Sequence, residues 1–231
     1  MIISVPLRIR LFVVLNLCIS HYRLMKRDDV MKQYKYDKLL GIRTGEDRFV
    51  SPSFNTHYNP YEPTSYETLE TLIEHYPIDK NDHIVDFGCG KGRVNFFLHH
   101  FTGASVKGIE MKDEFFEGAQ INLEKYKKNF PDSTSTIEFL VCLAEEYRIT
   151  ERDNRFYFFN PFSVQIFQKV VNNILHSVEE YPRSVDIILY YPHEDYIYYL
   201  EKNTAFELIQ EIKIDCFYKN DSDERILIYR K

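Results

Sequence analysis

The sequence lacks several features that would point to particular classes of protein. It contains no tryptophan and only eight glycines, and its four cysteines, Cys18, Cys89, Cys142 and Cys216, are too far apart to form a C-x-x-C metal or redox motif. The eight histidines also lack the spacing of metal ligands, so we expect no metal site. The formal net charge of -6 argues against non-specific binding to nucleic acid, which usually needs a basic face.

Long apolar runs that could cross a membrane are also missing. The run LFVVLNLCIS near the N-terminus is too short to span a bilayer, and no small-residue cleavage site follows it. Three interpretations stay open for the first twenty-odd residues: a weak export signal, an ordinary packing helix, or translated upstream sequence with the true start at Met25 or Met31. We favour the last two, expect no membrane association, and predict a cytoplasmic protein with free thiols.

The rest of the chain alternates between helix and strand signals. Residues 43–64 are rich in Pro, Asn, Ser, Thr and Tyr and are expected to form an extended loop. Parallel βαβ units follow from this alternation, so we predict an α/β fold: a mostly parallel sheet with a C-terminal antiparallel hairpin and helices on both faces. The domains are predicted as an extension and loop over 1–54 and a catalytic-type domain over 55–231. Strands are expected at 83–87, 105–110, 136–142, 155–160 and 185–191, helices at 66–75, 92–101, 113–128, 163–178 and about 195–201, and the hairpin at 206–218 and 225–229.

Three of the eight glycines fall within five residues, directly after a strand that ends in Asp86. Glycines in such a turn let the backbone approach a ligand closely, and the helix that follows offers free N–H groups. The spacing does not fit a phosphate-binding P-loop, and the third glycine comes one residue early for a dinucleotide fingerprint. What remains is Gly-x-Gly-x-Gly preceded by an acid, formed by Gly88, Cys89, Gly90 and Gly92.

This turn resembles motif I of the class I methyltransferases that use S-adenosylmethionine (SAM). Glu110 ends the next strand, where the resemblance implies an acid that binds the ribose hydroxyls of SAM. The segments YEPTSYETLE, VDFGCGKGRVNFFL, GIE, FYFFNPFS and IILYYP look like a group of small bacterial methyltransferases of unassigned substrate, over roughly residues 55–231. The resemblance implies a seven-stranded Rossmann-like sheet, SAM as cofactor, and cofactor contacts from Asp86, Gly88, Cys89, Gly90, Gly92 and Glu110.

One part of the pattern departs from the family. Class I members often have an acid after the third strand that meets the adenine amino group, but here Leu143 and Ala144 occupy that place. We predict that Ala144 lies at the cofactor and that Glu145 substitutes for the acid.

Asn160, Pro161 and Phe162 end the fourth strand and are the predicted catalytic residues. They resemble the Asn-Pro-Pro-Tyr motif of N-methyltransferases, in which the asparagine and a nearby carbonyl hold the acceptor nitrogen; the second proline is missing here. The alternative is that Asn160 and Pro161 only end a strand. Tyr61 and Tyr191 are predicted to contact the substrate. The loop that carries Tyr58, Tyr61 and Tyr66 lies where the resemblance implies a lid over the cofactor, and the alternative for each tyrosine is that it packs on the edge of the sheet.

The predicted function is therefore transfer of the SAM methyl group to an unidentified acceptor, with a nitrogen favoured. The acceptor can be a protein side chain, a small molecule or a nucleobase. Two alternatives stay open: an O-methyltransferase of a small molecule, and a SAM-binding regulator without turnover. The acidic net charge favours a protein or small molecule over nucleic acid.

Overall fold

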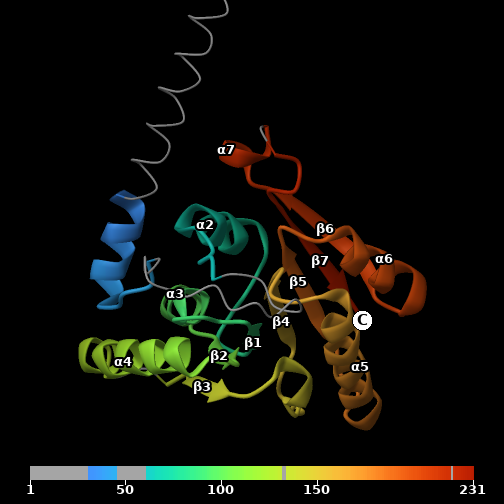
Figure 1. The fold of residues 1–231 in the computed structure, drawn as a ribbon, viewed down its shortest axis with the longest axis horizontal. Helices are drawn as coiled ribbons and strands as arrows, with labels where there is room; N and C mark the ends of the chain where they lie inside the picture. Colours follow the sequence, from blue (N-terminus) through green and yellow to red (C-terminus); the bar gives the residue numbers. More distant parts are fainter. Residues whose placement is uncertain (1–30, 46–60, 132–133, 220) are drawn as a thin grey trace, which may run out of the picture.

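The computed structural model describes residues 31–45, 61–131, 134–219 and 221–231 (Figure 1). The interpretations of the first twenty-odd residues, and of Tyr58 in the expected lid, fall outside the described residues. Among the described residues, no helix is long and apolar enough to cross a membrane.

A seven-stranded sheet forms the centre of the molecule, with the strand order β3-β2-β1-β4-β5-β7-β6. β5 and β7, and β7 and β6, pair antiparallel, and the other neighbours pair parallel. This confirms the predicted α/β class with its closing hairpin. The strands are β1 His83–Phe87, β2 Ser105–Glu110, β3 Ile137–Val141, β4 Arg155–Phe159, β5 Asp186–Tyr190, β6 Glu207–Lys213 and β7 Arg225–Arg230.

Helices cover both faces of this sheet. α2, α3 and α4 lie on one side, and α5 and α6 lie on the other (Figure 1). The described residues 31–40 are also helical, and Leu40 packs in the same core as α2 and α3. The bounds are α2 Tyr66–His75, α3 Arg93–Thr102, α4 Asp113–Asn129, the 3-10 helix η1 Ala144–Glu146, α5 Val164–Glu180, α6 Glu194–Asn203 and α7 Asp215–Tyr218.

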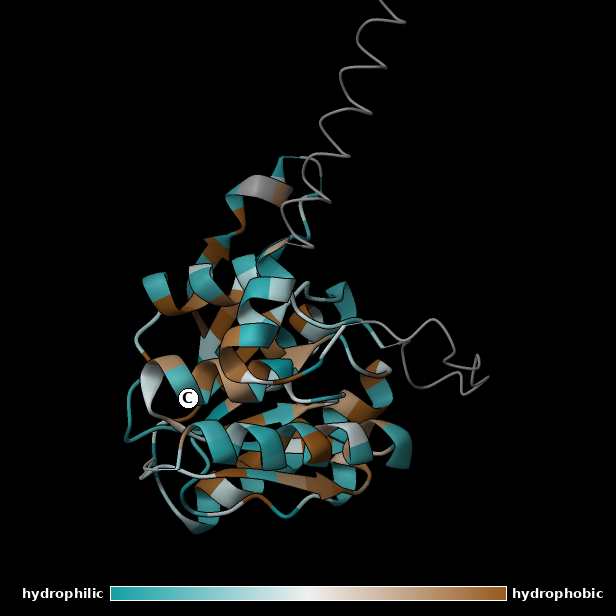
Figure 2. Ribbon diagram, turned by 90° about the vertical axis from the view of Figure 1, so that its left-hand side faces the viewer, coloured by the Kyte–Doolittle hydropathy of each residue, from teal (hydrophilic) through white to brown (hydrophobic). Residues whose placement is uncertain are grey.

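The central strands are apolar on both faces, as a doubly covered parallel sheet requires. In β4, Phe156 and Phe158 pack into the core under α5, and Tyr157 between them packs into the core under α3. All three rings are almost fully buried. Hydrophobic colour is accordingly concentrated between the helices, whose outward parts are mixed or hydrophilic (Figure 2).

Two local expectations need correction. Asp113 is not the N-cap of α4: the cap is Lys112, and Asp113 lies in the first turn, where its charge suits the helix dipole. The first hairpin arm ends at Lys213 rather than Tyr218. The N–H of Tyr218 donates to the carbonyl of Ile214 at 2.8 Å, so the chain turns into the short helix α7 instead of continuing as a strand.

Candidate active site

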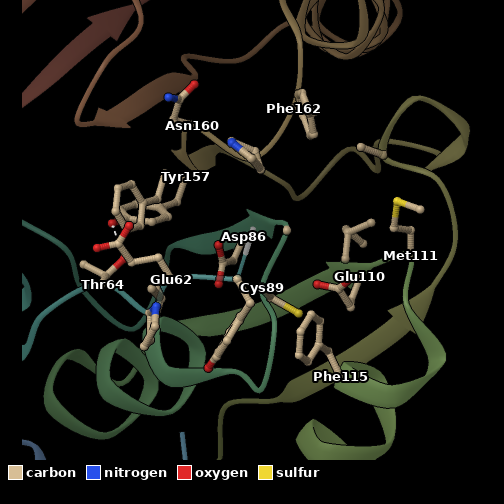
Figure 3. A pocket seen from close by; sticks show the side chains of 18 of the residues that line it. Glu62, Thr64, Asp86, Cys89, Glu110, Met111, Phe115, Tyr157, Asn160 and Phe162 are labelled. Carbon is tan, nitrogen blue, oxygen red and sulfur yellow. Dashed lines mark hydrogen bonds between the residues drawn. The ribbon is translucent and has the colours of Figure 1, made fainter. Parts of the chain in front are cut away.

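A pocket of about 360 Å³ opens at the carboxyl ends of β1, β2, β4 and β5 (Figure 3). Ligands bind at this edge in open α/β sheets, where the strand order reverses direction from β1 to β4. The pocket has two halves. We call the half over β1 and β2 the cofactor half, because the sequence predicts cofactor contacts there, and the half over β4 and β5 the acceptor half. The cofactor half is lined by Asp86, Gly88, Cys89, Ile109, Glu110, Met111, Lys112, Phe115, Cys142 and Ala144. The acceptor half lies over β4 and β5 and is lined by Glu62, Pro63, Thr64, Tyr157, Phe159, Asn160, Pro161, Phe162 and Tyr191.

The glycine turn shapes the floor of the cofactor half. Gly88, Gly90 and Gly92 have φ values of 78°, 54° and 85°, a region that favours glycine. A Cβ atom on Gly90 would lie 2.1 Å from the ring of Tyr61, and one on Gly88 would lie 2.7 Å from Cβ of Pro161. The turn therefore requires glycine for both its backbone conformation and its close contacts.

Two buried acids face this turn. Glu110 accepts hydrogen bonds from the N–H groups of Gly90 (3.0 Å) and Lys112 (2.9 Å), so its carboxylate fixes the turn against the end of β2. Burial raises the pKa of Glu110, and these N–H groups partly offset that effect.

Asp86 differs from Glu110 because its Oδ2 atom is buried without a hydrogen-bond partner in the part of the chain that is described. Only 3% of the residue is exposed. Burial, with a contribution from the Glu110 charge, raises the pKa of Asp86 well above its usual value. A buried polar atom without a partner costs free energy unless a ligand satisfies it, so this oxygen marks a place where a hydrogen-bond donor would bind.

Left-handed backbone conformations occur at the ends of both strands beneath the acceptor half. Asn160 follows β4 with φ 41°, and Tyr191 follows β5 with φ 49°; they are the non-glycine residues with positive φ in the described chain. Such conformations are costly for side chains other than glycine and cluster at functional sites. The two strand ends therefore turn toward the pocket instead of continuing along the sheet.

The segment before α2 closes the pocket from the side. The Tyr61 ring lies 4.6 Å from the ring of Phe115, and the Tyr61 hydroxyl donates to the carbonyl of Thr44 at 2.8 Å. Tyr61 thus lies over the glycine turn, at the cofactor half. Thr64 and Tyr157 are joined by a 2.9 Å hydrogen bond between their hydroxyls (Figure 3).

Tyr66 does not belong to the lid in which it was expected. It is 1% exposed, its ring stacks on Tyr36 at 4.7 Å, and its hydroxyl donates to Asp37 at 2.6 Å. Helical spacing places it on the inner face of α2, so it packs in the core.

The pocket brings together most of the residues predicted from the sequence. Gly90 and Gly92 do not line it but position the turn beneath it. Glu145 does not line it either: its backbone carbonyl accepts from Asn173 at 2.8 Å, and its carboxylate lies 3.5 Å from Lys169. The predicted residues that do line the pocket are Tyr61, Asp86, Gly88, Cys89, Glu110, Ala144, Asn160, Pro161, Phe162 and Tyr191.

Sequence reasoning missed Met111, Phe115, Cys142 and Glu62 at this pocket. Met111 directly follows the strand-end acid Glu110, so its position after β2 was the available signal. Phe115 lies one turn into α4, and no pattern in the sequence distinguishes its side chain from a core aromatic.

Comparisons with known proteins place this fold among methyltransferases. No family model matches the chain. A histone-lysine N-methyltransferase specific for lysine 79 of H3, from Dictyostelium discoideum, is 35% identical over 101 residues, which is 41% of this chain and 6% of that protein. An uncharacterised RNA methyltransferase of Oceanobacillus iheyensis is 30% identical over 115 residues, 50% of this chain and 22% of that protein.

Among solved structures, a tRNA (uracil-54, C5)-methyltransferase of Pyrococcus abyssi in complex with S-adenosyl-L-homocysteine superimposes with a TM-score of 0.51. It is 15% identical, and the match covers 74% of this chain and 40% of that chain. The resemblance to class I methyltransferases is thus confirmed at the level of the fold. Because the chain spans well under half the length of these three proteins, their activities are not carried over here.

Proposed function

We propose that this protein is a SAM-dependent methyltransferase that binds its cofactor over the glycine turn. The observation that carries the proposal is the unpartnered, buried Oδ2 of Asp86 inside the pocket, beside a second buried acid, Glu110. SAM offers donors that match these acids, because it has a cationic amino group and two ribose hydroxyls. Its flat adenine matches the apolar part of the cofactor half formed by Ile109, Met111, Phe115 and Ala144.

When bound, SAM supplies an activated methyl group on a sulfonium. The protein's part is to hold an acceptor in line with that methyl group and to exclude water. Asn160 lies at the end of β4 in the acceptor half, where its side-chain oxygen can accept hydrogens from an acceptor nitrogen and keep the lone pair directed across the pocket. This geometry needs no strong base beside the nitrogen.

A nitrogen acceptor is supported by two features. The Asn160-Pro161-Phe162 segment lies at the pocket, as it would in an N-methyltransferase, and one relative with similar sequence acts on lysine. The other relative is named an RNA methyltransferase, so the two relatives do not indicate one class of acceptor.

Calorimetric titration of SAM tests the cofactor site. We expect binding by the wild type and loss of binding in an Asp86→Ala/Glu110→Ala double variant, with Asp113→Ala on the exposed start of α4 as the matched control. A folded wild-type protein that does not bind SAM would refute the proposal.

Asn160→Ala separates an enzyme from a SAM-binding regulator. An enzyme should lose turnover while it keeps its SAM affinity, whereas a regulator should show no change in either measurement. Detection of the methylated atom by mass spectrometry would distinguish a nitrogen from an oxygen acceptor.

The proposed location is the cytoplasm. The widely spaced cysteines support it, because they suit a compartment in which thiols stay reduced. Fractionation of cells that express the full chain tests it, and recovery in a membrane or exported fraction would refute it.

A further inference from the structure

The acceptor half of the pocket is aromatic and negatively charged. Glu62 lines it and is exposed. The rings of Phe159 and Tyr191 also line it, with their centroids 6.5 Å apart. Aromatic faces and carboxylates are the two groups that attract an organic cation.

The positive charges at the pocket have other partners. The guanidinium of Arg93 donates to Thr44 Oγ1 at 2.8 Å and to the carbonyls of Thr64 and Thr44 at 3.1 and 3.2 Å, so its donors are taken up inside the protein. Lys112 lies in the cofactor half, over the ring of Phe115 at 5.4 Å.

The C-terminal hairpin adds further acids to the rim of the acceptor half. Because β7 runs antiparallel to β5, the described residues of the connection between β6 and β7, 214–219 and 221–224, lie at the carboxyl end of β5, on the same edge as the pocket. The N–H of Tyr191 donates to the carbonyl of Arg225 at 3.1 Å, and its hydroxyl donates to Asp221 at 2.8 Å. Tyr190 donates to Glu224 at 2.6 Å.

The charges of the neighbouring carboxylates affect the pKa of Glu224. The pKa of Glu224 is raised, first by burial and then by the negative charges of Asp221 and Glu62, although the Tyr190 hydroxyl lowers it. Glu62 comes from the segment before α2, and the other two acids come from the hairpin connection. Residues 214–224 contain four acids, with Lys219 as their single basic residue. We name Glu62, Asp221 and Glu224 the acidic rim.

We propose, on the basis of the methyl transfer proposed above, that the acceptor is an aliphatic ammonium group such as a lysine side chain. The acidic rim attracts the cation, and its carbon chain packs against Phe159 and Tyr191. The unpartnered oxygen of Asp86 belongs to the cofactor half, so the aromatic rings and the acidic rim are the features of the pocket that remain to bind the acceptor. A nucleic-acid backbone would meet repulsion at the same rim.

The reaction balances without a further reagent. The ammonium gives one proton to water at the open mouth of the pocket, and the lone pair of the neutral nitrogen then forms the bond to the methyl carbon. The carbon–sulfur bond breaks, and its electron pair stays on sulfur. The products are a methylammonium group, S-adenosyl-L-homocysteine and one proton.

The test uses labelled SAM with three acceptors: poly-L-lysine, fully acetylated poly-L-lysine and a synthetic RNA oligonucleotide. We expect label in poly-L-lysine and none in the other two. At low ionic strength, Glu62→Gln should raise the KM for poly-L-lysine about threefold and Glu62→Lys about tenfold, because each unit of exposed charge contributes modestly. Glu124→Gln, on the exposed face of α4, is the matched control and should leave KM unchanged.

Calorimetry with SAM on the same variants keeps this inference separate from the proposed function. Unchanged SAM affinity in Glu62→Gln together with a raised KM would support the acidic rim. SAM binding without label in poly-L-lysine, label in RNA, label that survives acetylation, or an unchanged KM in both Glu62 variants would overturn the acceptor class while the cofactor site stands. A folded protein that binds no SAM would instead overturn the proposed function.

Discussion

Asp86→Asn is expected to stabilise the protein in the absence of SAM and to weaken its binding of SAM. The carboxylate of Asp86 is buried, its Oδ2 has no partner among the described residues, and Glu110 lies close enough to repel it. Asparagine keeps the shape and removes the charge. A buried polar group without a partner costs about 1–3 kcal/mol of stability, and the neutral amide of asparagine still loses some of this amount. We therefore expect a gain of about 1–2 kcal/mol at pH 8, or roughly 2–8 °C in Tm for a chain of this size.

The difference in stability between the wild type and Asp86→Asn should depend on pH. The pKa of Asp86 is raised in the folded protein, so between the usual value and the raised value the folded state holds a proton that the unfolded state has lost. The stability of the wild type should therefore fall as pH rises through this window, whereas the Asp86→Asn variant lacks this contribution. The difference in unfolding free energy between the two should be largest at pH 8 and shrink as the pH is lowered toward 5.

Denaturant unfolding at several pH values, without SAM, measures this difference. Asp113→Asn on the exposed start of α4 is the matched control and should change stability by no more than about 0.5 kcal/mol. In calorimetry, Asp86→Asn should bind SAM about 10- to 100-fold more weakly, because a hydrogen bond to a charged group is lost. An Asp86→Asn protein that is less stable than the wild type at pH 8, or a difference that does not vary with pH, would refute the reasoning.

Three further predictions follow from particular contacts. Asn160→Ala should lower kcat by about 10²- to 10³-fold and leave SAM affinity within twofold in calorimetry, since the role proposed for this residue is to hold the acceptor; a loss of SAM affinity of the same size would contradict that role. Gly90→Ala should destabilise the protein by about 1–3 kcal/mol in denaturant unfolding, because of its φ of 54° and the Tyr61 ring. A Gly90→Ala/Tyr61→Ala double variant should regain only the stability that is lost through the clash with the Tyr61 ring. Full recovery of stability would show that the backbone conformation at residue 90 costs nothing. Asp186→Ala should cost about 3–5 kcal/mol, because it removes the buried partner of Arg230 and one of the two carboxylates that pair with Arg155, which keeps Asp82; a loss below 1 kcal/mol would show that water replaces the lost partner. Burial raises the pKa of Asp186, but hydrogen bonds from Arg230 and Tyr76 and the charge of Arg155 lower it overall, so its stabilising contribution should disappear as pH falls through that lowered pKa.

The regular elements could be predicted well because local signals and burial agree. The ranges expected for α2, β1 and β2 match the structure residue for residue, because each element has a clear boundary. The Ser65 side chain caps α2, β1 ends where the glycine turn begins, and β2 ends at the acid Glu110. The error at 214–218 has a local cause. The segment is mostly apolar and aromatic, which suits a strand, but the backbone hydrogen bonds to the carbonyl of Ile214 form a helical turn there.

The cofactor half could be predicted more completely than the acceptor half. Glycine tolerates the positive φ values of the turn better than other residues, so the three glycines in the sequence predict the backbone conformation of the turn. No comparable rule shows that Asn160 and Tyr191 have positive φ, because either residue can also occupy an ordinary strand end. Tyr66 was misassigned for a similar reason: a tyrosine beside a loop and a tyrosine in the first turn of a buried helix are distinguished only by tertiary packing.

The acceptor half depends on contacts between segments far apart in the sequence. Glu62 precedes α2, Asn160 follows β4, and the acids Asp221 and Glu224 belong to the last hairpin. The antiparallel insertion of β7 beside β5 brings Asp221 and Glu224 to the carboxyl edge of the sheet, where Glu62 and Asn160 also lie. In a sheet that closed with one more parallel strand, a helical crossover would stand between these acids and the pocket. If the protein transfers a methyl group as proposed, the closing hairpin offers a place for acceptor recognition that can vary without changing the cofactor half, and in this chain Asp221 and Glu224 make that place negative.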